Sequence, residues 1–129
     1  MIKYFDYAAW LGYCSLIFWL SSQSKLPIPK LFEYEDKVQH FTAFLLMTLF
    51  AMRAIRHHVR TQKQLMLYGV LFTWAYGLSD EIHQIFTPGR TPDVLDWLAD
   101  ASGALAAAGL WSWLYRKFAL KGLATDKSD

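Results

Sequence analysis

Residues 65–78 read LMLYGVLFTWAYGL, a run that is apolar except for Thr73. Residues 43–54, AFLLMTLFAMRA, are apolar except for Thr48 and Arg53. A helix on the surface of a soluble bundle keeps polar residues on its solvent face, at every third or fourth position. Both runs are hydrophobic all round, so they favour helices that lie in a membrane over a soluble four-helix bundle.

Two further apolar segments flank these runs, at about residues 7–20 and 94–118, and the runs themselves extend to about 38–55 and 65–86. A bilayer span needs roughly 20 mostly apolar residues. We expect the first segment, extended through Ile2, to be a permanent helix rather than a signal peptide. Its basic region is Lys3 alone, which Asp6 opposes, and no cleavage site of small residues follows Leu20.

The sequence therefore predicts an all-α integral membrane bundle of four transmembrane helices over residues 1–118, with a polar cytoplasmic tail at 119–129. The chain has 129 residues, enough for one domain, and 54 % of them are hydrophobic, which excludes disorder. Its one cysteine, Cys14, lies in an apolar stretch and excludes a disulfide within one chain.

Lysine and arginine gather on one side of the predicted bundle. The link between the second and third segments and the C-terminal tail carry most of them: Arg53, Arg56, Arg60, Lys63, Arg116, Lys117, Lys121 and Lys127. The positive-inside rule then predicts both termini in the cytoplasm and the links 21–37 and 87–93 outside. Because the basic residues are few and flank the membrane, they do not suggest binding to nucleic acid.

Ionisable and polar residues gather at the outward ends of the segments. They are Asp36, Lys37 and His40, then Asp80, Glu81, His83 and Gln84, then Arg90, Asp93, Asp96 and Asp100. Ionisable groups at membrane depth are costly, which makes them candidates for a functional site. Asp36 and Asp93 also suit a simpler role as caps at helix N-termini.

Asp96 and Asp100 continue inward on one face of the fourth segment, and Gly103 and Ala107 extend this stripe. Small residues permit close helix packing, so we expect this face to look into the bundle. The short turn after the third segment makes the third and fourth helices antiparallel neighbours. This should bring Glu81 and Gln84 close to Asp93 and Asp96.

Arg90 is the fixed cation that we expect to balance these acids, or to bind a phosphate or carboxylate ligand. Crowded carboxylates suit general acid–base catalysis, because crowding raises some of their pKa values. A divalent cation with Glu, Asp and His ligands could relieve the same crowding. No HExxH or CxxC spacing supports a zinc site, so the sequence leaves the metal unknown.

The motifs Asp36-Lys37-x-x-His40, Glu81-x-x-Gln84 and Arg90-x-x-Asp93-x-x-Asp96, with Gly103, resemble the VanZ-like family of small bacterial membrane proteins. The Ser21-Ser22-Gln23 run and Pro27 fit it as well, and the resemblance spans about residues 5–118. The family takes its name from a protein associated with resistance to the antibiotic teicoplanin. The resemblance implies a multi-pass protein of the bacterial cytoplasmic (inner) membrane and a link to the cell envelope, and it leaves the reaction open.

Three kinds of function stay open at this point. The first is an enzyme that acts at the outer leaflet on a lipid-linked or phosphate-bearing envelope substrate. In this hypothesis His40, Glu81 and Asp96 are catalytic, and Asp36, Lys37, Gln84, Arg90, Asp93 and Asp100 bind substrate. The second is a module that binds or transports an ion or amphiphile, and the third is an accessory structural subunit. Membrane lipids and a lipid-linked envelope precursor are the expected partners, and the oligomeric state is open.

Overall fold

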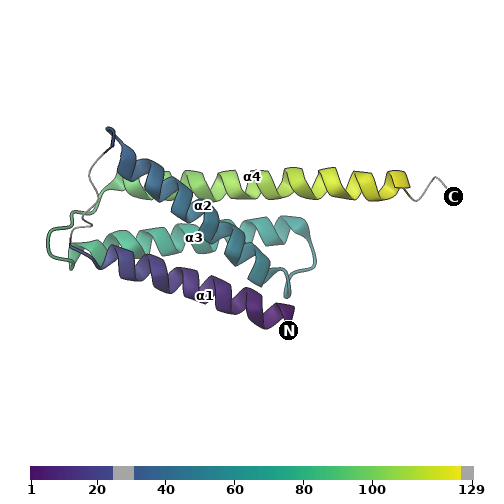
Figure 1. The fold of residues 1–129 in the computed structure, drawn as a ribbon, viewed down its shortest axis with the longest axis horizontal. Coiled ribbons are helices and arrows are strands. Elements are labelled where there is room, and N and C mark those ends of the chain that lie inside the picture. Colours follow the sequence, from purple (N-terminus) through teal and green to yellow (C-terminus); the bar gives the residue numbers. More distant parts are fainter. Residues whose placement is uncertain (25–30, 126–129) are drawn as a thin grey trace.

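The computed structural model describes residues 1–24 and 31–125, and all regular structure in these ranges is helical. The four helices are α1 (Ile2–Ser21), α2 (Glu35–Ile55), α3 (Gln62–Ile85) and α4 (Val94–Thr125). The predicted all-α fold of four helices is therefore confirmed. Successive helices run in opposite directions, so the start of α1 and the far end of α4 point to the end of the bundle that holds the α2–α3 link (Figure 1).

The helices begin and end close to the predicted segments. α3 starts after Thr61, whose side-chain oxygen accepts a hydrogen bond from the Gln64 backbone nitrogen at 3.2 Å, as an N-cap does. α4 continues past Phe118 to Thr125, into the stretch predicted as a polar tail. The two prolines of the first outward link, Pro27 and Pro29, lie outside the described residues.

α4 packs more extensively against α2 than against α3. The closest approach is at Gly103, where an added Cβ would lie 2.3 Å from the Phe41 carbonyl oxygen. Ala104 and Ala107, on the same face of α4, are fully buried. The predicted inward stripe of small residues is confirmed, and it lets the α2 and α4 backbones meet without intervening side chains.

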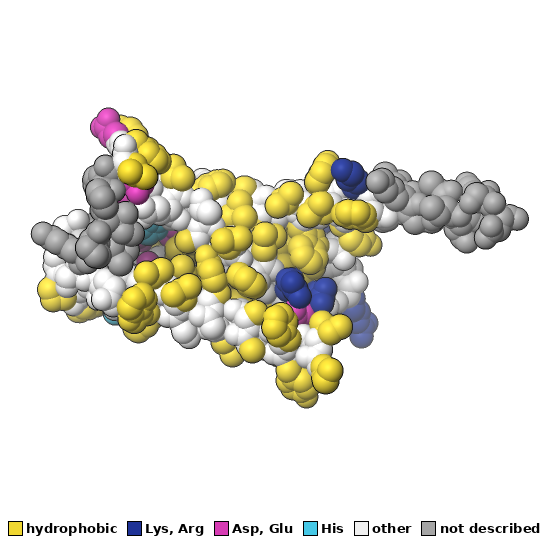
Figure 2. Space-filling view, viewed as in Figure 1, with side chains coloured by type: hydrophobic (Ala, Val, Ile, Leu, Met, Phe, Trp, Pro, Cys, Tyr) yellow, Lys and Arg dark blue, Asp and Glu magenta, His cyan; other side chains and the backbone are white. Residues whose placement is uncertain are grey.

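The outer surface of the bundle is apolar along every helix. Leu11 on α1 is 62 % exposed, Leu67 on α3 is 53 % exposed and Leu105 on α4 is 55 % exposed. Figure 2 shows one face of the bundle. Apolar side chains cover its middle, lysine and arginine lie at one end, and acidic and histidine side chains lie in a recess at the other end. The charged groups on this face are thus concentrated at its two ends.

By length and composition, α2 is the one helix within the described ranges that could cross a membrane, with a mean hydropathy of 1.4. A helix of this kind is weak evidence by itself, since a helix in a soluble core can have the same composition. The predicted arrangement of four spans, with both termini in the cytoplasm, therefore remains a prediction.

Candidate functional site

The outward ends of all four helices, as the sequence predicts them, come together at one end of the bundle (Figure 1). Many of the polar side chains there are withdrawn from the surface. The buried ones are Ser21, Asp80, Glu81, Gln84, Thr87, Asp96 and Asp100. The candidate residues thus form a buried polar cluster rather than a solvated rim.

Lys37 joins the start of α2 to the start of α4. Its ammonium group donates to Asp36 at 2.9 Å, and to Asp93 and Asp96 at 2.6 Å each. The sequence favours Arg90 as the cation that balances the acids, but Lys37 has this role for three of them. It can do so because it lies in the first turn of α2, directly across from the first residues of α4.

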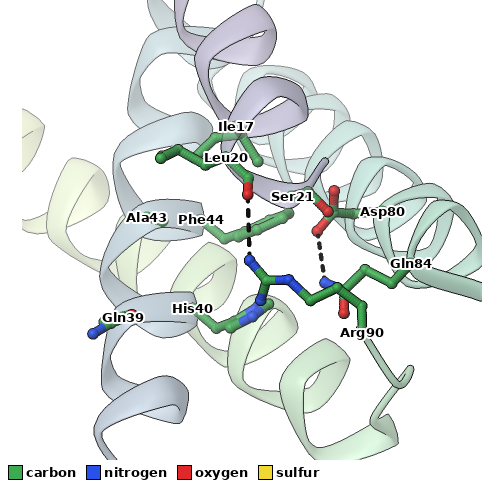
Figure 3. A pocket seen from close by; sticks show the side chains of 10 residues that line it. All are labelled: Ile17, Leu20, Ser21, Gln39, His40, Ala43, Phe44, Asp80, Gln84 and Arg90. Atoms are coloured by element: carbon green, nitrogen blue, oxygen red, sulfur yellow. Dashed lines mark hydrogen bonds between the residues drawn. The ribbon is translucent and has the colours of Figure 1, made fainter. Parts of the chain in front are cut away.

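Arg90 binds the end of α1 instead. Its Nε donates to the Gln23 carbonyl oxygen at 2.8 Å. An Nη donates to the Leu20 carbonyl oxygen at 3.3 Å, the contact drawn in Figure 3. The last carbonyls of a helix have no partner within the helix, and a cation is favourable there. Arg90 therefore fixes the end of α1 against the α3–α4 turn.

Asp93 is a cap for α4, as predicted: its Oδ1 accepts a hydrogen bond from the Leu95 backbone nitrogen at 2.8 Å. The hydrogen bond from Lys37 lowers the pKa of the Asp93 carboxyl below its ordinary value of 3.8. Asp36 does not cap α2, because the N-cap position belongs to Tyr34, and no side chain caps that end. Asp36 pairs with Lys37 instead.

His40, Glu81 and Asp100 form a second group, deeper than Lys37. The Nδ1 of His40 lies 2.9 Å from Oδ1 of Asp100. An ionised carboxylate can only accept a hydrogen bond, so this nitrogen donates. The Oε2 of Glu81 accepts from the Asp93 backbone nitrogen at 2.8 Å, which places Glu81 beside the start of α4 as predicted.

One ligand-type atom from each of these three residues lies within 4.8 Å of the other two. Within the part of the chain that the structure describes, Oε1 of Glu81 and Oδ2 of Asp100 are buried and have no hydrogen-bond partner. A buried polar atom without a partner is costly. These two oxygens are therefore open positions in the group formed by His40, Glu81 and Asp100.

A pocket of about 120 Å³ lies beside this cluster, between α1, α2, α3 and the loop after α3. Figure 3 shows the side chains that line it. Its polar wall includes His40, Asp80, Gln84 and Arg90, and its apolar wall is formed by Ile17, Leu20, Ala43 and Phe44. His40 therefore belongs both to the pocket wall and to the buried cluster behind it.

His83 contacts α1. Its Nε2 lies 2.9 Å from the hydroxyl of Ser22, and its ring centroid lies 4.6 Å from that of Phe18. Gln84, which the sequence places near Asp93 and Asp96, lines the pocket, where its Nε2 donates to Asp80 at 3.5 Å.

A family model described as VanZ/LLP1 matches residues 8–115. The chain belongs to the VanZ/LLP1 family. No curated protein and no solved structure matches the chain. The range that matches VanZ/LLP1 takes in most of the described bundle and includes all nine candidate site residues, which are Asp36, Lys37, His40, Glu81, Gln84, Arg90, Asp93, Asp96 and Asp100.

A second charged cluster lies at the opposite end of the bundle, around a residue just outside the VanZ/LLP1 match. Asp6 is buried, and its carboxylate accepts from Arg53 at 2.8 Å and from Arg56 at 3.0 Å. A ring nitrogen of His57 lies 2.9 Å from the same carboxylate. The sequence predicts for Asp6 only that it opposes Lys3. A signal for this pairing is present in the sequence, because Asp6 is the one acidic residue of α1. Antiparallel helices place it at the same end of the bundle as the basic α2–α3 link.

Proposed function

We propose that this VanZ/LLP1 protein spans the bacterial inner membrane four times, with its polar pocket facing outward and both termini in the cytoplasm. We further propose that it acts there on a lipid-linked or phosphate-bearing substrate of the cell envelope. The proposal rests on one observation, the buried polar cluster beside a pocket that has a polar wall and an apolar wall.

The exposed apolar side chains support the membrane part of the proposal. Leu16 and Phe18 on α1, Leu71 on α3, and Leu110 and Phe118 on α4 are between 41 % and 62 % exposed. In water, continuous apolar surface of this kind is unusual for a monomeric protein. Lipid contact would explain it on all four helices. The basic α2–α3 link would then be cytoplasmic by the positive-inside rule.

The contacts of His40 support the chemical part. A general acid or base works best when a second group orients it. Asp100 is fully buried and holds one ring nitrogen of His40, while His40 also lines the pocket. We assign catalytic roles to His40, Glu81 and Asp96.

The pocket suggests which part of a substrate would bind. Pockets for drug-sized ligands have volumes of about 300–1,000 Å³, and this one has about 120 Å³. It would therefore hold a headgroup rather than a whole lipid, with an acyl or prenyl chain leaving along the apolar side near Ile17 and Leu20. Arg90 lines the pocket and supplies a positive charge for a phosphate or carboxylate group. The other candidate residues would position the substrate or the side chains that contact it; they are Asp36, Lys37, Gln84, Asp93 and Asp100.

Product analysis of a lipid-linked substrate tests the reaction. Purified protein in detergent would be incubated with polyprenyl phosphate and polyprenyl diphosphate lipids, followed by mass spectrometry. We expect the native protein and Glu33→Gln to change the mass of at least one of these lipids. We expect Glu81→Gln to leave the lipids unchanged. Glu33 is an exposed carboxylate just before α2 and serves as the matched control. Equal lipid profiles with the native protein and with Glu81→Gln would refute the proposed reaction.

Cysteine labelling tests the orientation separately. In a Cys14→Ser background, Glu33→Cys and Arg60→Cys each supply a single thiol at opposite ends of the bundle. A membrane-impermeant maleimide added to intact spheroplasts should label position 33 and leave position 60 unlabelled until the cells are opened. Labelling of position 60 alone would reverse the proposed orientation, and labelling of both in intact cells would rule out a fixed four-span topology.

A further inference from the structure

Three side chains of metal-binding type meet beside the pocket, one from each of three helices, and His40 among them lines the pocket. His40 comes from α2, Glu81 from α3 and Asp100 from α4. We propose that these three residues bind a divalent metal ion of the Mn²⁺, Fe²⁺ or Zn²⁺ class. This inference stands on the contacts of the three residues and does not depend on the proposed substrate.

The two open oxygens described above are the first reason. Glu81 is 6 % exposed and Asp100 is fully buried, and each uses one carboxylate oxygen for a hydrogen bond within the protein. The second oxygen of each is without a partner among the described residues. A cation between the two carboxylates would satisfy both oxygens at once, which a further hydrogen bond from His40 would not do.

Local charge is the second reason. Lys37 is fully engaged with Asp36, Asp93 and Asp96, and the guanidinium contacts of Arg90 go to backbone carbonyls. Among the described residues, no lysine or arginine forms an ion pair with Glu81 or Asp100, and His40 is the side chain that bonds Asp100. A buried charge that lacks a partner is strongly unfavourable. A divalent ion would neutralise two carboxylates while His40 binds as a neutral ligand.

The chemistry of the three side chains sets the class of metal. Carboxylate and imidazole ligands together suit Mn²⁺, Fe²⁺ and Zn²⁺, whereas thiolate or thioether ligands would be needed to select Cu⁺. Three protein ligands also leave coordination positions for water or a substrate oxygen, as in catalytic rather than structural sites. Because His40 lines the pocket, such positions would be next to a bound headgroup.

The backbone leaves room for this carboxylate pair. A Cβ added to Gly77, one turn before Glu81, would lie 2.9 Å from Oδ2 of Asp100. Asp100 thus occupies space that a side chain at position 77 would fill. The ligand residues come from helices that also contact one another directly, and sites built on such elements are held more accurately than sites on loops.

Electron paramagnetic resonance of Mn²⁺ tests the site without any substrate. The full-length protein in detergent, stripped with a chelator, would be titrated with Mn²⁺ and then with Zn²⁺ as a competitor. We expect one tight Mn²⁺ per chain with nitrogen coupling from His40, displaced by Zn²⁺. Affinity should fall at least tenfold in Glu81→Gln and in Asp100→Asn, and the nitrogen coupling should vanish in His40→Ala.

Glu33→Gln is the matched control, since it removes an exposed carboxylate from the same end of the bundle, and its affinity should equal that of the native protein. Circular dichroism in detergent would confirm that each variant is helical, and Asp100→Asn keeps an oxygen that can accept from His40. Absence of saturable Mn²⁺ and Zn²⁺ binding, or equal binding by Glu81→Gln and the native protein, would overturn the inference. Metal binding without turnover of polyprenyl lipids would leave the site standing and refute only the proposed reaction.

Discussion

Replacing Gly103 with alanine should separate α2 from α4. The added Cβ would lie 2.3 Å from the Phe41 carbonyl oxygen and 3.0 Å from the Leu45 backbone nitrogen. Both contacts are with backbone, so no side chain can turn away to relieve them. The two backbones would have to move apart by at least about 0.7 Å, the difference between 2.3 Å and the 3.0 Å that such contacts need. Forcing extra atoms into a packed core typically costs about 1–3 kcal/mol.

Gly109→Ala is the matched control, because it adds the same methyl group to the same helix where nothing lies within 4 Å. Alanine is better than glycine in a helix by about 0.5–1 kcal/mol, so this variant should be as stable as the native protein or slightly more stable. Denaturant unfolding of the purified proteins in one detergent, followed by circular dichroism, would give the free energies. Equal unfolding free energies for the two variants would refute the close α2–α4 contact.

The same displacement should reach the polar cluster. His40 directly precedes Phe41, and Asp100 lies one turn before Gly103 on the opposing helix. Their hydrogen bond is 2.9 Å long, and an increase of about 0.7 Å would bring it beyond the range of a side-chain hydrogen bond. Gly103→Ala should therefore weaken the proposed metal binding as well, whereas Gly109→Ala should leave it unchanged.

Three further outcomes are expected. Lys37→Met keeps most of the length of the side chain and removes its charge, so it should lower the thermal midpoint near neutral pH. An unchanged midpoint would contradict the role of Lys37. The lowered pKa of Asp93 means that its stabilisation is complete above the ordinary value of 3.8 and is lost as pH falls through the lower folded-state value. The melting temperatures of the native protein and Asp93→Asn should therefore differ by a constant amount above about pH 4 and converge as pH falls further. A difference that stays constant below about pH 4 would count against the pairing. Asp6→Asn should weaken the contact with Arg53 and speed hydrogen exchange in α1, whereas Lys63→Gln, which changes an exposed basic residue in the first turn of α3, should not.

Much of the fold could be predicted because it follows from local patterns. The long apolar runs determine where the helices lie, and the turn after α3 is short enough to make α3 and α4 antiparallel neighbours. The inward direction of Asp96, Asp100 and Gly103 follows from their spacing on one helix, and burial confirms it. Spacing along one helix was therefore a reliable guide to the direction of these side chains.

The partners of the charged residues could not be predicted in the same way. Whether Lys37 or Arg90 balances the acids depends on the rotation and register of α2 against α4, which no local pattern determines. The pairing of Asp6 with Arg53 depends on two chain segments that meet only after the helices pack. The sequence could predict which end of the bundle is polar, but not which hydrogen bonds connect its residues.

The most direct test of the account is the stability of Glu81→Gln with and without Mn²⁺. Glutamine keeps an oxygen that can accept from the Asp93 backbone nitrogen, and it removes a buried charge with one open oxygen. We predict that the metal-free variant is at least as stable as the native protein. At a concentration a hundredfold above the native Kd, Mn²⁺ should stabilise the native protein by about 2.7 kcal/mol and the variant, whose affinity is at least tenfold lower, by no more than about 1.4 kcal/mol. A metal-free variant that is clearly less stable, or one that Mn²⁺ stabilises equally, would show that Glu81 serves the fold rather than a metal site.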